Sequence, residues 1–145
     1  MSELKFIQVQ DAALIPRRLL EQVKGLPFDP QRFYDHWYLM QGPINMLFVI
    51  ADTDLPDPVV GMLWLTVNMM GDSLDVNLLS MDREYQDGKF PWEVIGPRIL
   101  TIQRAAGMKH TYWWTRHPKA FIRKTGGQCV QRDLFLMELT PNEEV

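Results

Sequence analysis

Residues 59–81 read VVGMLWLTVNMMGDSLDVNLLSM, and this stretch decides the fold class of the chain. Residues 59–69 are mostly β-branched, aromatic and other apolar side chains, which is typical of a long strand. Residues 73–81 are a second such run, and Met70, Gly71 and Asp72 between the two suit a tight turn. The stretch therefore predicts two long antiparallel strands joined as a hairpin.

The segments around this hairpin extend it to a mixed sheet. Residues 45–51 predict a third strand, which makes an antiparallel meander with the hairpin. Apolar residues at helical spacing predict a helix over 91–106, in which Pro97 must either produce a kink or delay the start. Residues 111–115 are β-branched and aromatic, and we expect a strand there that runs parallel to residues 73–81.

The ends of the chain add further elements to this sheet. Residues 4–10 alternate apolar and polar side chains, which predicts a first strand. Asp11 predicts the start of a helix that Gly25 ends, and Asp29-Pro30 predicts the start of a second helix. A short helix at 118–124 and an extended segment at 129–139 complete the order β-α-α-β-β-β-α-β-α-β. This order describes an α/β (α+β) fold with a mixed sheet.

Composition sets limits on the kind of protein. The chain has 145 residues, 46% of them hydrophobic, and we expect one domain over residues 1–139 with a polar tail at 140–145. A formal net charge of −3 argues against nucleic-acid binding, and the single Cys129 argues against disulfides and multi-cysteine zinc sites. The three histidines lack metal-ligand spacing, so no metal is expected. With neither a signal-peptide pattern nor a long apolar run, a cytoplasmic protein without membrane contact is expected.

The connection between the hairpin and the next helix reads DREYQDGKFPW, residues 82–92. A glycine-rich turn before a helix offers unpaired backbone N–H groups to an anion. Here Pro91 has no N–H to offer, and Asp87 adds a negative charge. Lys89 is the side-chain cation placed to compensate. The connection therefore has the position of an anion site with a poor composition for one.

The element order and this connection resemble the GCN5-related N-acetyltransferases (GNATs) over nearly the whole chain. In that family the loop reads Arg/Gln-x-x-Gly-x-Gly/Ala, and its amides bind the pyrophosphate of coenzyme A. Gln86 matches the first position, whereas the glycine positions fall on Lys89 and Pro91, and a register shifted by one keeps only Gly88. The resemblance implies that any acetyl-CoA site would be formed by residues near the end of the hairpin and in this loop: Leu79, Met81, Gln86, Asp87, Gly88, Lys89 and Phe90.

A second stretch, HPKAFIRKTGG at residues 117–127, resembles the last helix of the family. Ala120 and Phe121 match its scaffold, but Ile122 stands where a tyrosine often protonates the departing thiolate. The resemblance also implies a carboxylate on the central strands as general base. Residues 59–69 contain no such carboxylate, so Asp75 is the nearest candidate. His117 is a second catalytic candidate, with a helix-capping or surface role as the alternative.

These features resemble the small, degenerate GNAT-like proteins encoded among the morphogenesis genes of tailed bacteriophages. Two functions stay open. The favoured one is a non-catalytic structural or interaction protein of a phage particle or its assembly, without a cofactor and located in the host cytoplasm or the virion. Its partner would be another protein or a second copy of the chain. The alternative is an acetyl-CoA-dependent N-acetyltransferase.

Aromatic residues near the loop suggest where a partner would bind. Phe90 and Trp92 flank the degenerate motif, and aromatic residues are enriched at the centres of protein interfaces. We expect at least one of them to be partly exposed in the isolated chain and buried against a partner. Along the strand at 111–115 the faces alternate, so Tyr112 and Trp113 are expected to point to opposite sides of the sheet.

Overall fold

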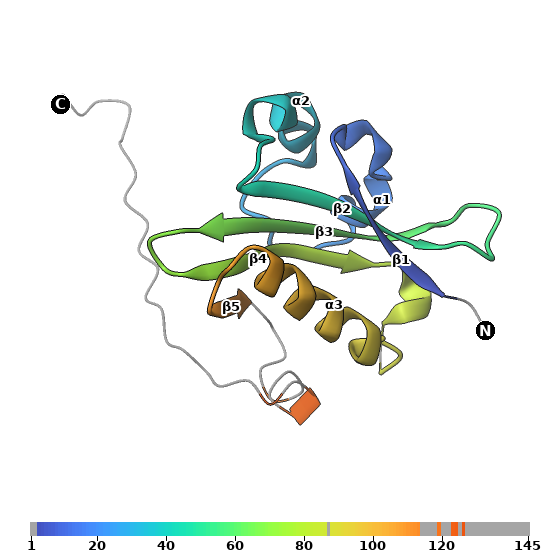
Figure 1. The fold of residues 1–145 in the computed structure, drawn as a ribbon. Coiled ribbons are helices and arrows are strands. Elements are labelled where there is room, and N and C mark those ends of the chain that lie inside the picture. Colours follow the sequence, from blue (N-terminus) through green and yellow to red (C-terminus); the bar gives the residue numbers. More distant parts are fainter. Residues whose placement is uncertain (1–2, 87, 114–118, 120–122, 125, 127–145) are drawn as a thin grey trace, which may run out of the picture. The chain divides into compact units, whose positions relative to one another are not determined.

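The computed structural model describes residues 3–86, 88–113, 119, 123, 124 and 126 (Figure 1). The chain divides into two compact units, Met1–Trp114 and Thr115–Val145, and the helices and strands below all belong to the first. The helix predicted at 118–124 and the extended segment at 129–139 fall largely or wholly outside the described residues. One domain over residues 1–139 therefore stays a prediction.

The first unit is built on one five-stranded mixed sheet. Its strands are β1 (Leu4–Val9), β2 (Asn45–Asp52), β3 (Val59–Asn68), β4 (Ser73–Met81) and β5 (His110–Trp113), in the spatial order β1-β2-β3-β4-β5. The first four strands are antiparallel neighbours, and β5 lies parallel to β4. The predicted meander and the parallel strand that follows it are both confirmed, and so is the α+β fold class.

The segment after β1 differs from its prediction. Instead of one helix ending at Gly25, it forms a 3-10 helix, η1 (Ala12–Leu14), and a short helix, α1 (Arg17–Glu21). Ile15 between them is extended, with φ −89° and ψ 118°, because a residue before proline is kept out of the helical region. The prediction of one continuous helix was wrong for this local reason.

The starts of the N-terminal helices follow the sequence more closely. The Asp11 carboxylate accepts a hydrogen bond from the N–H of Ala13 at 2.9 Å and caps η1. Helix α2 (Pro30–Met40) begins after Asp29, whose carboxylate accepts from the N–H of Gln31 at 2.9 Å. Both aspartates satisfy amides that a helix start leaves unpaired, as their positions predict.

Helix α3 (Trp92–Ala105) connects β4 to β5. It begins at Trp92 and contains Pro97, so the proline does not delay its start. The helix ends at Ala105, and Gly107 shortly after it has a left-handed φ of 73° and donates its N–H to the carbonyl of Arg104 at 3.0 Å. The chain then turns into β5 beside the β3–β4 hairpin.

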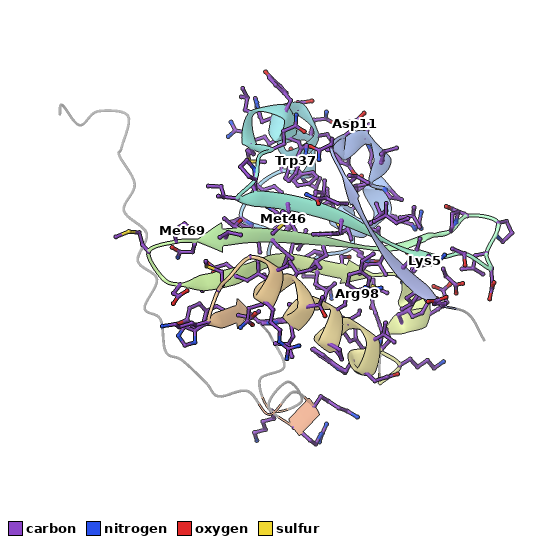
Figure 2. The ribbon with its side chains drawn as sticks, in the orientation of Figure 1. Lys5, Asp11, Trp37, Met46, Met69 and Arg98 are labelled. Atoms are coloured by element: carbon purple, nitrogen blue, oxygen red, sulfur yellow. The ribbon has the colours of Figure 1, made fainter. Side chains whose placement is uncertain are left out.

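The helices cover the two faces of the sheet, α1 and α2 on one side and α3 on the other (Figure 1). Trp37 of α2 lies in the core on the first face (Figure 2). The buried residues of that face are Val9, Ala12, Ile15, Leu19, Leu20, Phe33, Trp37, Leu47, Val49 and Met62. Those of the α3 face are Phe48, Ile50, Val60, Leu63, Leu65, Leu74, Val76, Met81, Ile95 and Ile99. None of the described helices combines the length and apolar character needed to cross a membrane.

Candidate functional site

A β-bulge interrupts the middle of β4. Trp64 of β3 pairs with Leu78 and Leu65 pairs with Val76, so Asn77 is left over as the bulged residue. The parallel pairing of β4 with β5 ends at the same place, since Val76 is its last paired residue in the described part. From Asn77 onward the β5 side of β4 therefore has no described strand beside it.

A group of polar side chains lies on the α1–α2 face of β4 and β5 near this bulge. The Asp75 carboxylate accepts a hydrogen bond from the Ser73 hydroxyl at 2.7 Å. Asp75 lies in register with Tyr112, and the Tyr112 ring stacks on that of His110 with centroids 6.0 Å apart. Asp75 thus accepts a hydrogen bond from Ser73 and lies beside Tyr112 in the strand register.

Several backbone N–H groups of the loop after β4 form hydrogen bonds within the loop. A 3-10 turn, η2 (Arg83–Tyr85), follows Asp82. Three loop N–H groups donate to carbonyl oxygens within the loop: Tyr85 to Asp82 at 2.9 Å, Gln86 to Arg83 at 3.1 Å and Lys89 to Gln86 at 3.2 Å. These donors are spent inside the loop and do not converge on a point where an anion would sit.

The predicted cofactor residues at the end of β4 are also engaged. Met81 is buried, and its carbonyl accepts from the side-chain amides of Gln22 and Gln86, each at 2.7 Å. Leu79 is half-buried against the α3-side core. Gln86 matches the first motif position, and its side-chain amide donates to the backbone of β4.

The glycine of the loop has a conformational role. Gly88 has a φ of 86°, and a Cβ built on it would meet no atom within 4 Å. The left-handed backbone at this position favours glycine. No neighbouring group lies close enough to require the absence of a side chain. Lys89 beside it is exposed. Two predicted site residues, Asp87 and His117, lie outside the described residues.

Three aromatic rings form a row from the start of α3 to β5. Phe90 and Trp92 have ring centroids 4.5 Å apart, and Trp92 and Trp113 have centroids 5.8 Å apart. All three are half-buried, and Phe90 and Trp113 pack against the α3-side core. The prediction that at least one of Phe90 and Trp92 is partly exposed is confirmed, whereas burial against a partner stays a prediction. We call Phe90, Trp92 and Trp113 the aromatic row.

Solved structures with this arrangement of elements include several acetyltransferases. A possible acetyltransferase from Clostridium difficile 630 superposes with a TM-score of 0.68 at 12% identity, covering 94% of this chain and 98% of its own. The chain has the GNAT fold. The aminoglycoside N-acetyltransferase AAC(6')-Iy in complex with CoA gives a TM-score of 0.69 at 9% identity, covering 95% and 96% of the two chains. An acetyltransferase of Trypanosoma brucei gives 0.64 at 14% identity, covering 94% and 100%.

At identities this low the likeness concerns the GNAT fold alone. No protein-family model matches the sequence, and no curated protein matches it. The seven predicted cofactor residues and the catalytic candidates Asp75 and His117 therefore stay predictions. In the described part of the chain, no group of three His, Cys, Asp or Glu side chains is arranged to hold a metal ion.

Two features near the candidate site were not predicted from the sequence. One is the bulge at Asn77, which depends on the register between β3 and β4. The other is a hydrogen bond from the Tyr85 hydroxyl in the loop to the Asp52 carboxylate at the end of β2, 3.0 Å long. Tyr85 and Asp52 are far apart in sequence, and no local pattern signals their contact.

The Tyr85 contact gives a prediction for the pH dependence of stability. Burial, followed by the hydrogen bond to Asp52 and the charge of this carboxylate, raises the pKa of Tyr85 from 10.0 to about 12. Because the folded state holds the phenol proton more tightly, this contribution is complete below pH 10 and is lost as the pH rises to 12. We expect urea-unfolding free energies to fall more steeply over this range for the wild type than for Tyr85→Phe. Equal slopes would contradict the raised pKa of Tyr85.

Proposed function

We propose that this chain uses the GNAT fold for protein binding and does not turn over acetyl-CoA. The observation that carries the proposal is the aromatic row, in which the half-buried rings of Phe90 and Trp92 flank the degenerate loop motif beside the start of α3. The setting we propose is a tailed-phage particle or its assembly in the host cytoplasm, which follows from the sequence resemblance. The partner is another protein or a second copy of the chain.

The loop supports this proposal through its chemistry. An anion site at a helix start needs converging N–H groups, and here the amides of Tyr85, Gln86 and Lys89 donate to loop carbonyls. Pro91, the residue before α3, contributes no N–H. Losing one or two charge-assisted hydrogen bonds costs roughly 2–4 kcal/mol of binding free energy. This corresponds to an affinity for the pyrophosphate lower by roughly 30- to 700-fold.

Half-exposed aromatic side chains support the binding part of the proposal. Large rings left partly in water are costly unless they are used, and such residues often form the energetic centre of an interface. Phe90 and Trp92 touch each other, with ring centroids 4.5 Å apart, so they present one continuous surface. A partner that covers this surface would remove both rings from water.

A calorimetric titration with acetyl-CoA tests the cofactor part. We expect no binding, or binding only at millimolar ligand, because three of the loop amides already donate to loop carbonyls and Pro91 has no N–H. CoA without its acetyl group serves as a control for pyrophosphate recognition alone. Micromolar affinity for either ligand would reverse the proposal and make Lys89→Ala the next variant to measure.

Sedimentation velocity tests the partner part for the case of a second copy. We expect concentration-dependent association of the wild type and weaker association of Trp92→Ala, by about tenfold or more, as for an interface hot spot. Tyr38→Ala, which removes an exposed ring from α2, is the matched control and should leave association unchanged. A monomer at every concentration would exclude the second copy and leave a different protein as the partner.

A second candidate function, N-acetyl transfer, is favoured by the polar group on β4. Asp75 accepts from Ser73 and lies in register with Tyr112 beside the bulge, where a general base would be placed. Acetyl transfer depends largely on holding amine and thioester together, so it does not strictly require every acid and base. If acetyl-CoA binds tightly, Asp75→Asn should lower the rate of thiol release. An unchanged rate would exclude Asp75 from that role.

A further inference from the structure

A group of apolar side chains lies at the end of the sheet where β2 begins and β3 turns into β4. Ile44 comes just before β2, and its carbonyl accepts a hydrogen bond from the N–H of Val67 at 2.7 Å, which continues the pairing of β2 with β3. Met46 and Val67 pack against the edge of the α3-side core. Met69 lies at the tip of the β3–β4 hairpin (Figure 2), and Met70 follows it. We call these five residues the hairpin-end patch.

The hairpin-end patch leaves much apolar surface in water. Ile44 is 54% exposed, Met69 69% and Met70 98%, while Met46 and Val67 are half-buried. At about 200 Å² for a fully exposed large side chain, the patch presents roughly 500 Å² of apolar surface. A standard interface buries about 800 Å² on each partner, and about three-fifths of that area is apolar. The patch therefore has the apolar area that one side of a stable dimer needs.

The patch is formed by uncharged stretches of the chain. Residues 40–46 and 67–71 contain no Asp, Glu, Lys or Arg. The next charged residue along the hairpin, Asp72, is paired with Lys109, whose ammonium lies 3.8 Å from its carboxylate. Two copies that meet through this patch therefore bring no like charges together. Its methionine side chains can also adapt their shape to an opposing surface.

Hydrogen bonds hold the tip of the hairpin in place. The Asn68 side-chain oxygen accepts from the N–H of Gly71 at 3.0 Å. The Asp72 carbonyl accepts from the N–H groups of Lys109 and His110, at 3.0 and 3.1 Å, and so ties the tip to the start of β5. A surface that is already ordered loses less conformational entropy when a partner covers it. The hairpin tip is thus suited to forming part of an interface.

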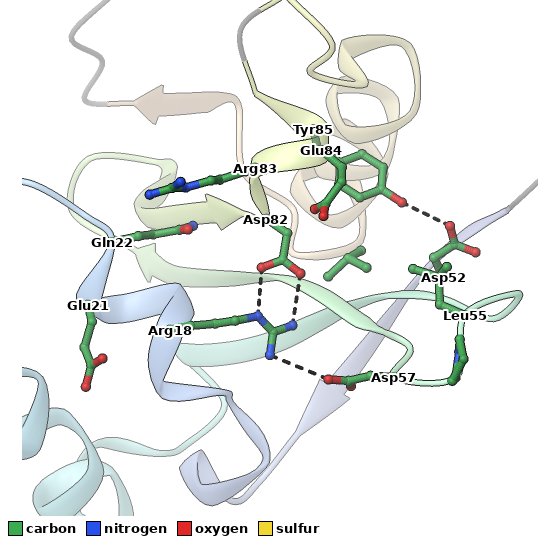
Figure 3. A pocket seen from close by; sticks show the side chains of 12 residues that line it. Arg18, Glu21, Gln22, Asp52, Leu55, Asp57, Asp82, Arg83, Glu84 and Tyr85 are labelled. Carbon is green, nitrogen blue, oxygen red and sulfur yellow. Dashed lines mark hydrogen bonds and ion pairs between the residues drawn. The ribbon is translucent and has the colours of Figure 1, made fainter.

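The opposite end of the sheet is acidic. An open cavity of about 940 Å³ lies there between α1, the β2–β3 connection and residues 82–85 (Figure 3). Five carboxylates and two guanidinium groups line it. One of these guanidinium groups, that of Arg18, already donates to both carboxylate oxygens of Asp82, at 2.9 and 3.0 Å. Contact between two copies at this end would bring like charges together.

Strand β2 separates the acidic end from the hairpin-end patch. Ile44 precedes the strand and Asp52 is its last residue, so its length places them roughly 25 Å apart. This separation exceeds the Debye length of about 8 Å at physiological ionic strength. Two copies joined at the patch therefore keep their acidic ends apart, which matters for a chain of net charge −3. The distribution of charge favours this end for a contact between identical chains.

We propose that a second copy of the chain docks on the hairpin-end patch, so that the same patch of both copies forms a symmetric dimer interface. In such an interface each residue has its counterpart on the partner, and Met69 and Met70 of both copies are removed from water. The proposal goes beyond the protein binding proposed for the aromatic row, since the two surfaces share no residue.

Sedimentation equilibrium of the full chain carrying Trp92→Ala tests the proposal, because this background weakens any association through the aromatic row. We expect Trp92→Ala to form a dimer in a concentration-dependent manner. Addition of Met70→Glu should weaken this dimer by about tenfold or more, since a symmetric contact brings both added carboxylates into one apolar interface. A monomer at every concentration of Trp92→Ala would overturn the proposal.

Leu14→Glu in the same background is the matched control. Leu14 is exposed on η1, outside the patch, and its variant has the same net charge as Met70→Glu. The control should change the dimer affinity by less than about twofold, because an exposed charge away from the interface is screened by water. Equal losses in the two variants would mean general repulsion between negative chains and would overturn the interface.

A third variant tests whether the patch is one surface. Ile44→Glu places the same charge beside β2 instead of at the hairpin tip, and it should also weaken the dimer by about tenfold. Ile44 and Met70 are both exposed, so the variants are expected to fold normally, and thermal denaturation checks this. A dimer that Ile44→Glu leaves unchanged would overturn the hairpin-end patch as the interface.

Discussion

Trp37→Ala is expected to lower the free energy of unfolding by about 3–5 kcal/mol, the usual cost of truncating a buried aromatic side chain. Trp37 is only 2% exposed. Its ring centroid lies 5.2 Å from that of Phe33 and 6.1 Å from that of Trp64. Alanine would leave a large cavity between α2 and the sheet. Since a domain of this size is stable by roughly 5–15 kcal/mol, urea denaturation should show a large shift of the midpoint.

Trp37→Phe is the informative control for that experiment. The Trp37 indole Nε1 is buried and has no hydrogen-bond partner in the described part of the chain. Phenylalanine keeps ring contacts and removes this unsatisfied donor, so it should cost less than half as much as alanine. A cost for Trp37→Phe close to that of alanine would show that the N–H has a partner after all.

Gly61→Ala is expected to destabilise the chain by about 1–3 kcal/mol through overpacking, and Gly61→Val by more. A Cβ on Gly61 would lie 2.3 Å from the Met81 sulfur, 3.0 Å from the Ser80 carbonyl oxygen and 3.3 Å from the Cβ of Ile50. The first of these contacts is impossible without movement, and Met81 is only 2% exposed, so it has little room to move. Thermal and urea unfolding of the variants measure the loss.

Gly96→Ala is the matched control for Gly61. Gly96 lies inside α3, and a Cβ there would meet no atom within 4 Å. Because alanine is a better helix former than glycine, this change should stabilise the chain by up to about 1 kcal/mol. A similar loss of stability at both positions would mean that the crowding at Gly61 is not the cause.

The Gly61 experiment also bears on the candidate site. Met81 ends β4, and its carbonyl holds the side-chain amides of Gln22 and Gln86. A displaced Met81 should therefore loosen the start of the loop. Hydrogen exchange of the loop amides in Gly61→Ala, compared with Gly96→Ala, would detect this effect.

Much of the fold follows from local pattern. The runs in residues 59–81 predict β3, β4 and their hairpin because side-chain type and turn residues act within a few positions. The Asp29-Pro30 pair predicts the start of α2 because capping satisfies amides two residues away. The poor composition of the loop for binding an anion can also be predicted from the sequence, since Pro91 has no N–H in any fold. These features required no knowledge of distant contacts.

What the sequence by itself determined is thus the five described strands, the α+β class, most of the described helix starts and the weakness of the loop motif. Only the tertiary structure decided the bulge at Asn77, the aromatic row and the contact of Tyr85 with the buried Asp52. The register of β3 against β4 sets the bulge, and the return of the chain through α3 brings Trp113 to Trp92. Contacts of this kind depend on how complete elements pack together, and no short stretch of residues encodes that packing.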